Sequence, residues 1–394
     1  MEIITTSLSS LTFKEQSYAS CKKDLPVYVF DPQALKKYCQ VFLDYFSGIT
    51  LYAVKTNMDP LILKTIKAAG INSFDVASLE EIKLVRNLFP DSKLFFMNPV
   101  KAESAIKIAY KNYDVKAFVL DADWELEKIL KATDYAKDLI LFLRLKVDGS
   151  GSVIDLNTKY GLEHQEAVSL LKRIKKLGAQ VGLCFHVGTQ CKDASKFSKA
   201  IEQASSIIKA VNFEIDFLDI GGGFPVCADQ SQQIPLLLDF FTVIQEALDT
   251  NQISKATKIL CEPGRALVAN AEKLIVKIIG RKGNYLYLND GFFGGLSELN
   301  FDIPFSVKAL PLNQRKFSTT QKAFYFYGPT CDSNDFINRA FYLPENIQIS
   351  DLIEIAQIGA YSRVFRTNFN GFYASKMVIL EENSKKVAIK QCNS

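Results

Sequence analysis

The stretch TLYAVKTNMDPLILKTIKAAGINSFDV, Thr50–Val76, contains the unit that decides the fold. Its first residues are apolar or β-branched and predict a buried strand over Thr50–Val54. Apolar residues then recur at helical spacing over Asp59–Ala69, and a second short apolar run follows at Ser73–Val76. A strand, a helix and a second strand in this order are typical of a parallel sheet.

The same alternation continues to about residue 270. Further strands are predicted at Lys93–Phe96, Ala117–Leu120, Leu139–Leu143, Gln180–Phe185, Phe217–Ile220 and Lys258–Cys261. Helices are predicted between them at Leu79–Leu88, Ala102–Lys111, Trp124–Ala132, Gln165–Leu177 and Ser195–Val211. Eight such units match the size of a closed (β/α)8 TIM barrel, whereas an open doubly wound sheet is the alternative. We therefore predict an α/β protein with a barrel over residues 35–270.

The pattern changes after residue 270. Short strands are predicted there without long helices between them, at Ala271–Ile279, Tyr285–Leu288, Phe324–Tyr327, Asp351–Ile355 and Lys376–Leu380. The segment Pro26–Phe30 is also strand-like and could join the same sheet. We expect a β-sandwich or β-barrel domain formed by residues 1–34 and 271–394.

The composition excludes several classes of protein. The 394 residues are 48% hydrophobic with a formal net charge of +4, which gives no reason to expect a nucleic-acid partner. The longest apolar runs, such as Leu139–Leu143, are too short to cross a membrane. The segment Met1–Leu11 lacks the basic start and apolar run of a signal peptide. We expect a cytoplasmic protein without a membrane partner.

Cysteine and histidine usage indicates neither a disulfide framework nor a metal site. The eight cysteines contain no C-x-x-C pair. The two histidines, His164 and His186, are too few for a histidine-rich metal site. We expect no metal.

In a (β/α)8 barrel the active site forms at the carboxyl ends of the strands. Lys55 directly follows the first predicted strand. Burial of an ammonium group at an apolar strand end is costly, which favours the neutral amine that forms a Schiff base. A lysine that reaches solvent at the start of a loop is the alternative.

Glycines and charged residues follow the last two predicted strands. Gly221–Gly223 would let backbone N–H groups approach a phosphate, although a tight turn explains a glycine triplet equally well. Glu262 could pair with a protonated ring nitrogen, and Arg265 could bind phosphate. A simple Glu–Arg surface pair is the alternative.

Other polar residues lie at the ends of the middle strands. His186 could stack on a flat cofactor, or it could be a hydrogen-bonded core residue, and the Thr189 hydroxyl could bind phosphate. Asp75 and Arg144 are further polar groups at strand ends. Together with Lys55 they form a constellation suited to a phosphorylated pyridine cofactor.

The chain resembles the barrel-type pyridoxal-phosphate decarboxylases of ornithine, lysine, diaminopimelate and arginine, and is most similar to the eukaryotic-type ornithine decarboxylases. The motifs that carry the resemblance run in order over nearly the whole chain: Tyr52-Ala-Val-Lys55-Thr-Asn57, Phe74-Asp-Val-Ala-Ser78, His186-Val-Gly-Thr189, Asp219-Ile-Gly-Gly-Gly-Phe-Pro225, Glu262-Pro-Gly-Arg265, Gly328-Pro-Thr-Cys-Asp332, and Gly359-Ala-Tyr361 with Phe369-Asn-Gly-Phe372.

The resemblance implies a role for each motif. Lys55 would bind pyridoxal phosphate as a Schiff base, His186 would stack on its ring, and Glu262 would pair with its nitrogen. Cys331 would protonate the substrate carbon after carbon dioxide leaves. Asp75 and Arg144 would support the neighbourhood of the lysine. The residues implied in phosphate binding are Thr189, Gly222, Gly223, Arg265 and Tyr361, and Gly264 is implied in cofactor binding.

The resemblance also implies a homodimer with shared active sites, in which Cys331 and Asp332 come from the partner subunit. Asp302 and Asp332 would bind the distal ammonium of the substrate through charge-assisted hydrogen bonds and repel a distal carboxylate. Phe301 and Phe369 would line the substrate site. Phe301 stands where the family often has Tyr, and Ile303 where it usually has His, so the length of the diamine is open.

The resemblance therefore implies decarboxylation of L-ornithine to putrescine, with L-lysine as a second candidate. A decarboxylase of diaminopimelate or carboxynorspermidine is the nearest alternative, and Asp302 with Asp332 argues against it. Cys331 argues against an alanine-racemase-like enzyme. Lys55 and Cys331 argue against a non-catalytic homologue of the antizyme-inhibitor kind.

Overall fold

The structure, a computed structural model, describes residues 24–311, 315–380 and 387–392. They form two compact units. One comprises Tyr38–Pro225 and Ser231–Ala266, and the other comprises the described residues up to Lys37, Val226–Gln230 and the residues from Leu267 onward. The segment Met1–Leu11, used above to argue localisation, lies outside the described residues. Within them, no helix is both long and apolar enough to cross a membrane.

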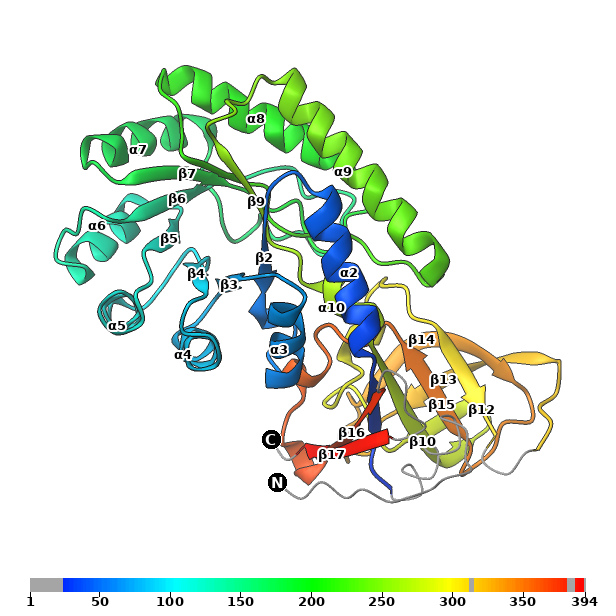
Figure 1. Ribbon diagram of the computed structural model, residues 1–394. Helices are drawn as coiled ribbons and strands as arrows, with labels where there is room; N and C mark the ends of the chain where they lie inside the picture. The colour runs from blue at the N-terminus through cyan, green and yellow to red at the C-terminus, as the bar shows by residue number, and fades with distance from the viewer. Residues whose placement is uncertain (1–23, 312–314, 381–386, 393–394) are drawn as a thin grey trace. The chain divides into compact units, whose positions relative to one another are not determined.

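The first unit is the predicted (β/α)8 barrel, seen in Figure 1 in blue to green. Each strand pairs in parallel with the next, and the last pairs with the first, which closes the barrel. The strands are β2 (Ile49–Ala53), β3 (Ser73–Val76), β4 (Lys93–Phe96), β5 (Ala117–Leu120), β6 (Ile140–Arg144), β7 (Gln180–Cys184), β8 (Phe217–Asp219) and β9 (Lys258–Cys261). The open-sheet alternative is wrong.

Helices follow the strands, and the helical spacing predicts six of them but not the helices at Pro32–Tyr45, Gln233–Thr250 and Arg265–Val268. They are α3 (Pro60–Ala68), α4 (Leu79–Leu88), α5 (Glu103–Tyr113), α6 (Asp123–Ala132), α7 (His164–Lys176), α8 (Ser195–Val211), α9 (Gln233–Thr250) and α10 (Arg265–Val268), with α2 (Pro32–Tyr45) before β2. Local capping sets two of the starts. At the start of α3, the Asp59 side chain accepts a hydrogen bond from the Leu61 N–H, and Pro60 is the first helical residue. At the start of α4, the Ser78 side chain accepts one from the Glu81 N–H.

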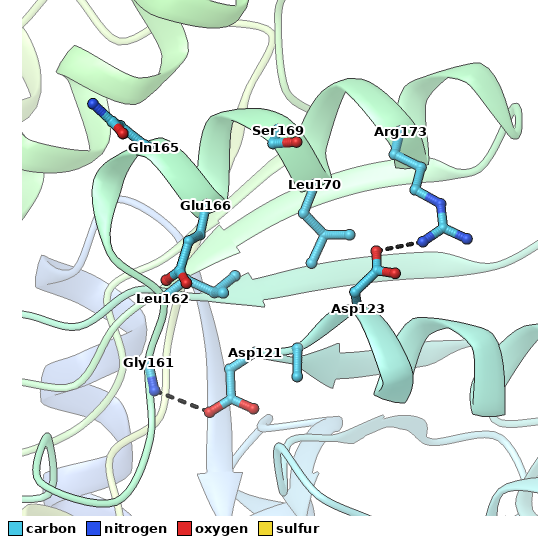
Figure 2. Close-up of a pocket in the computed structure, with 10 residues that line it drawn as sticks. Asp121, Asp123, Gly161, Leu162, Gln165, Glu166, Ser169, Leu170 and Arg173 are labelled. Atoms are coloured by element: carbon cyan, nitrogen blue, oxygen red, sulfur yellow. Dashed lines mark hydrogen bonds and ion pairs between the residues drawn. The ribbon is translucent and has the colours of Figure 1, made fainter.

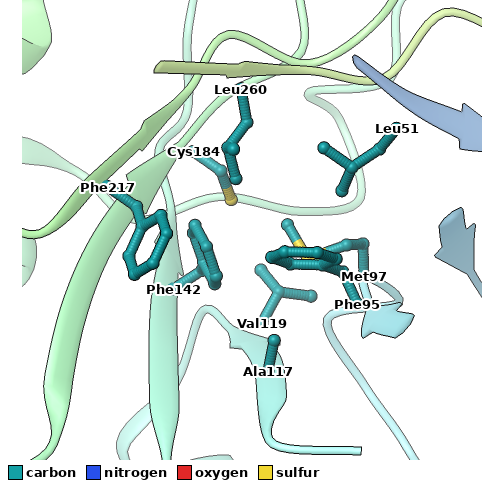
Figure 3. Packing of buried hydrophobic residues seen from close by; sticks show 9 residues of the cluster. All are labelled: Leu51, Phe95, Met97, Ala117, Val119, Phe142, Cys184, Phe217 and Leu260. Atoms are coloured by element: carbon teal, nitrogen blue, oxygen red, sulfur yellow. The ribbon is translucent and has the colours of Figure 1, made fainter. Parts of the chain in front are cut away.

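The interior of the barrel is filled by side chains (Figure 3). The buried cluster consists of Leu51, Phe95, Met97, Ala117, Val119, Phe142, Cys184, Phe217 and Leu260. A Cβ atom on Gly182 would lie 2.5 Å from the Phe142 ring, so glycine makes room for that aromatic residue. The barrel is a packed core without a pore, which leaves its carboxyl end as the place for chemistry.

The second unit is a mixed β-sheet. Its strands are β1 (Val27–Phe30), β10 (Glu272–Lys282), β11 (Tyr285–Leu288), β12 (Val307–Leu310), β13 (Gln321–Tyr327), β14 (Phe336–Pro344), β15 (Leu352–Ala356), β16 (Ser375–Leu380) and β17 (Val387–Cys392). Strand β1 pairs with β10 and β16, which confirms that Pro26–Phe30 joins the C-terminal sheet. The sequence did not predict β12, β14 or β17.

Candidate functional site

Lys55 lies in the short 3-10 turn Val54–Thr56 that follows β2. Its Nζ lies 3.2 Å from Oδ2 of Asp75, which belongs to the neighbouring strand β3. The Asp75 side chain is 1% exposed, but that of Lys55 is 41% exposed. The prediction of a buried lysine is therefore wrong. The Lys55 side chain is therefore partly exposed to solvent, and the buried carboxylate of Asp75 binds its amine.

Two buried carboxyl groups lie at the ends of β8 and β9. Asp219 is 0% and Glu262 is 7% exposed, and the two carboxyl groups interact electrostatically. Burial raises the pKa of Asp219 to about 7. Burial, and secondarily the charge of Asp219, raises the pKa of Glu262 well above its usual range. Near neutral pH burial therefore favours the protonated form of these acids.

His186 lies two residues beyond the end of β7. Its Nδ1 accepts a hydrogen bond of 3.0 Å from the Gly188 N–H, so the ring proton is on Nε2. Burial, with the charges of Arg144 and Lys55, lowers the pKa of His186 well below its usual value. A Cβ atom on Gly222 would lie 3.1 Å from Nε2. His186 thus offers a flat, neutral ring.

The glycine triplet forms a turn that only glycine can adopt. Gly221 and Gly223 have φ angles of +69° and +96°. A Cβ atom on Gly221 would meet the Phe185 carbonyl at 2.1 Å, and one on Gly223 would meet the Gly188 carbonyl at 2.3 Å. The loops after β7 and β8 therefore pack closely, with backbone groups at the barrel end.

The loop after β9 approaches the turn that carries Lys55. A Cβ atom on Gly264 would lie 2.0 Å from Thr56 Oγ1, so glycine is needed for this contact. Arg265 follows at the start of α10 and is 6% exposed. The barrel thus gathers Lys55, Gly264 and Arg265 at one end of the sheet, together with the acids described above.

Several polar atoms at this end are buried without a hydrogen bond to the described part of the chain. They are Asp75 Oδ1, Asp219 Oδ2 and Arg144 Nε. Buried polar atoms are rarely left so unless another group completes their bonding. A protonated pyridine nitrogen would suit the acid pair, a phosphate would suit the glycine turn, and an aldehyde would suit Lys55. The residues present fit pyridoxal phosphate.

A second set of predicted residues lies in the β unit, on the loop that joins β13 to β14. Asp335, which is 1% exposed, accepts hydrogen bonds from the Phe292 N–H at 2.6 Å and from both the N–H and hydroxyl of Thr330. These bonds fix the backbone of the loop that carries Cys331 and Asp332. Cys331 itself is exposed.

Asp302 is exposed on a segment with a fixed backbone. Arg339 Nη1 donates hydrogen bonds to the carbonyl oxygens of Phe301 and Ile303, at 3.3 and 2.7 Å. These two bonds flank Asp302 on either side and set its position. An acid held in this way can bind a cation without first having to order its own loop.

Two predicted aromatic residues lie further along the β unit. Phe369 is 41% exposed and packs against the Phe293 ring, with centroids 5.2 Å apart. Tyr361 has a φ of +53°, and its ring stacks on that of Phe365. That Tyr361 contacts phosphate, and that Cys331 and Asp332 serve a partner's site, stay predictions.

Some residues at these sites had no predicted role. Asp219 precedes the glycine triplet in a quoted motif, and a carboxylate at the end of a buried strand could have been singled out. Glu81 could not have been singled out, because it lies in the first turn of α4, where an acidic residue is common in a capped helix. Burial raises the pKa of Glu81 to about 7, and its Oε2 accepts the Ala77 N–H.

A hollow of about 590 Å³ lies elsewhere on the barrel, between the starts of α6 and α7 (Figure 2). Its acids have structural partners. Asp121 accepts the Gly161 N–H, Asp123 pairs with Arg173, and Glu166 accepts the Glu163 N–H at the helix start. None of the predicted site residues lines it, so we assign it no chemistry.

Comparison with known sequences identifies a family and several relatives. Residues 33–269 match the profile described as pyridoxal-dependent decarboxylase, pyridoxal binding domain. The chain is 32% identical to the lysine/ornithine decarboxylase of Selenomonas ruminantium, over 86% of this chain and 84% of the relative. It is 34% identical to the ornithine decarboxylase of Rattus norvegicus, over 87% and 77%. Antizyme inhibitor 2 of Xenopus laevis is 32% identical, over 82% and 74%.

Solved structures show the same architecture. The arginine decarboxylase of Paramecium bursaria Chlorella virus, bound to agmatine, has a TM-score of 0.82 at 26% identity and covers 93% of this chain and 99% of its own. The lysine/ornithine decarboxylase of Vibrio vulnificus, complexed with putrescine, has a TM-score of 0.79 at 28% identity, over 94% and 99%.

Proposed function

Because this chain belongs to the pyridoxal-dependent decarboxylase family, we propose that it converts L-ornithine to putrescine and carbon dioxide, with L-lysine as its second substrate. The observation that carries the substrate class is Asp302, an exposed carboxylate whose backbone is fixed on both sides by Arg339. A carboxylate in that position favours a distal ammonium over a distal acid.

The barrel end would hold the cofactor. Lys55 would bind it covalently, with Asp75 orienting the lysine Nζ before and after the reaction. Gly222, Gly223, Thr189, Gly264 and Arg265 would hold its phosphate, together with Tyr361 and backbone N–H groups. The neutral ring of His186 would pack against its face, because an uncharged imidazole does not repel a cationic ring.

When bound, pyridoxal phosphate supplies an electron sink for the bonding pair that carbon dioxide leaves behind. Glu262 would keep the ring nitrogen protonated. Asp219 interacts electrostatically with Glu262, and burial favours a proton on both acids in the cofactor-free protein. Arg144 contributes a positive charge to the same buried set.

Cys331 would complete the reaction. Its Sγ would donate a proton to the substrate α-carbon, after which the thiolate regains a proton from solvent. Asp302 and Asp332 would hold the distal ammonium and so fix which carbon faces the thiol. We propose that Cys331 and Asp332 act in the site of a partner subunit, in a homodimer with two shared sites.

The test is release of carbon dioxide by the cofactor-loaded protein from ornithine, lysine, arginine and diaminopimelate. We expect the largest kcat/KM for ornithine, with lysine lower by a factor of roughly 10 to 200, because one methylene changes binding by about 1–3 kcal/mol. Arginine as the best substrate would replace the ornithine assignment, and diaminopimelate as the best would overturn the role of Asp302. Cofactor binding without release from any substrate would indicate a non-catalytic homologue.

A further inference from the structure

Asn370 lies directly against Cys331, although 39 residues separate them in the sequence. Its Oδ1 accepts two hydrogen bonds from Cys331, at 3.1 Å from the backbone N–H and at 3.2 Å from Sγ. A backbone N–H can only donate, so the amide atom that it meets is the oxygen. The same oxygen is then an acceptor for the thiol proton.

The backbone at Asn370 is unusual for a residue with a side chain. Its φ and ψ are 50° and 12°, in the left-handed region, and Gly371 follows with a φ of +80°. Asparagine tolerates this region better than most residues, but glycine would adopt it with less strain. This position therefore carries a side chain although its backbone conformation favours glycine. The Asn370 side chain uses its oxygen to bind both the N–H and the Sγ of Cys331.

The two loops that meet here are both anchored to the adjacent residues Phe292 and Phe293. Asp335 fixes the Cys331 loop through its bonds to Phe292 and Thr330. The Thr367 N–H donates to the Phe293 carbonyl, which ties down the segment that leads to Asn370. Since both backbones are fixed, what remains variable is the rotamer of the cysteine side chain, which has three staggered positions.

We propose that Asn370 is a positioning residue that holds Cys331 Sγ in one rotamer; the thiol proton, bonded to Asn370 Oδ1 at rest, turns about the Cβ–Sγ bond toward the substrate α-carbon for delivery. This rests on the proposed role of Cys331 as the proton donor. In that step the S–H bond breaks, a C–H bond forms with the electron pair left by carbon dioxide, and sulfur becomes a thiolate. Asn370 exchanges no proton. It determines where the thiol points.

The test compares Asn370→Gly with Asn370→Asp. The glycine variant removes the acceptor and keeps the left-handed backbone, so it should fold. The aspartate variant keeps both an acceptor oxygen and a side chain that tolerates this φ. The first readout is product fidelity. A proton delivered to the wrong carbon leaves the amino group on the cofactor and releases an amino-aldehyde in place of the diamine. We expect Asn370→Gly to raise the aldehyde fraction about tenfold or more, and Asn370→Asp to lie well below it.

The second readout needs no turnover. Iodoacetamide alkylates Sγ, and a Cys331 side chain released from Asn370 can present Sγ to the reagent in more than one rotamer. We expect alkylation of Cys331 to be several-fold faster in Asn370→Gly than in the unmodified protein, with Cys331→Ala as the blank for other cysteines. A slower or unchanged rate, together with unchanged product fidelity, would overturn the proposal.

Cys331→Ala separates the proton-donor role of Cys331 from the positioning role of Asn370. If it diverts product to the aldehyde while Asn370→Gly does not, the proton-donor role stands and the positioning role is wrong. If Cys331→Ala itself gives normal diamine at a normal rate, both are wrong. Diversion by both variants, with fidelity recovered in Asn370→Asp, supports the positioning role.

Discussion

The barrel end and the Cys331 loop hold their functional side chains in opposite ways. In the barrel, Asp75, Asp219 and Glu262 are almost completely buried, and burial shifts the protonation of the last two. On the β unit, Cys331, Asp302 and Phe369 are exposed. Hydrogen bonds fix the backbone near Cys331 and Asp302, and Phe369 packs on the Phe293 ring. The first set has a low-dielectric environment of its own. The second obtains one only when another surface covers it, as the proposed partner subunit would.

This difference implies that the two regions act separately in the reaction. Changes in the barrel should affect cofactor binding and stability together, because buried charges enter both. Changes on the β unit should affect substrate and product while leaving the cofactor in place. The following variants test whether the two regions act separately.

Lys55→Ala should have the largest effect. It removes the covalent link to the cofactor, so we expect loss of the long-wavelength absorption band and a fall in kcat of about 10³-fold or more. Absorption spectra before and after dialysis against buffer without cofactor check the first point. A variant that keeps the band after dialysis would show that another lysine binds the cofactor.

Glu262→Gln should separate activity from stability. Loss of the carboxylate that pairs with the ring nitrogen should lower kcat about 100-fold or more. The cofactor-free protein should instead become more stable at pH 8, since a buried carboxyl that resists ionisation has been replaced by a neutral amide. Urea unfolding at pH 8 measures this. Lower stability of the variant at pH 8 would mean that burial of the Glu262 carboxyl does not destabilise the folded protein at that pH.

Asp302→Asn should act on the substrate alone. Loss of one charge-assisted hydrogen bond costs about 1.5–3 kcal/mol, so kcat/KM for ornithine should fall roughly 10- to 100-fold. The absorption band should not change. Asp239→Asn, at an exposed acid on α9, is the matched control and should leave both quantities unchanged. An equal loss in the control would assign the effect to net charge.

The smallest effect concerns pH. Asp219 has a raised folded pKa of about 7, so its stabilising contribution is present at low pH and is lost as the pH rises through 7. His186, whose folded pKa is lowered, changes stability only as the pH falls below its usual value of 6.5. Through Asp219 alone, the free energy of unfolding of the cofactor-free protein should therefore fall by about 0.8 kcal/mol in total between pH 6.5 and 8, most of it below pH 7.5.

Asp219→Asn is the control for that slope. It removes one member of the acid pair, so the decrease between pH 6.5 and 8 should become shallower. Urea titrations at three pH values in this interval suffice. An equal slope in the variant would assign the pH dependence to other buried acids, of which Glu81 is the first to examine.

Much of the fold was predictable because local patterns carry it. The strands Ser73–Val76, Lys93–Phe96 and Lys258–Cys261 have the bounds that their short apolar runs predict. Helix α9 was missed because its residues, from Ile234 onward, are apolar on most sides and hide the helical period. Strand β14 was missed because polar residues such as Asn338 interrupt its exposed face.

The site was predictable as a set of motifs, but its pairings were not. Motif order located Lys55 and Cys331, yet no local pattern states that Lys55 is half exposed above Asp75. The electrostatic interaction of Asp219 with Glu262, and the contact of Asn370 with Cys331, depend on neighbours that are distant in sequence. Such pairings follow from strand register and loop packing, which single residues do not encode.

The most direct test of the shared-site account is to mix Lys55→Ala subunits with Cys331→Ala subunits. Each variant alone should be nearly inactive in making diamine. Random exchange gives mixed dimers in about half of the molecules, each with one intact site, so roughly a quarter of the unmodified activity should return. Failure to recover activity, when exchange of subunits has been verified by a tag, would contradict the claim that the barrel of one chain works with the Cys331 loop of another.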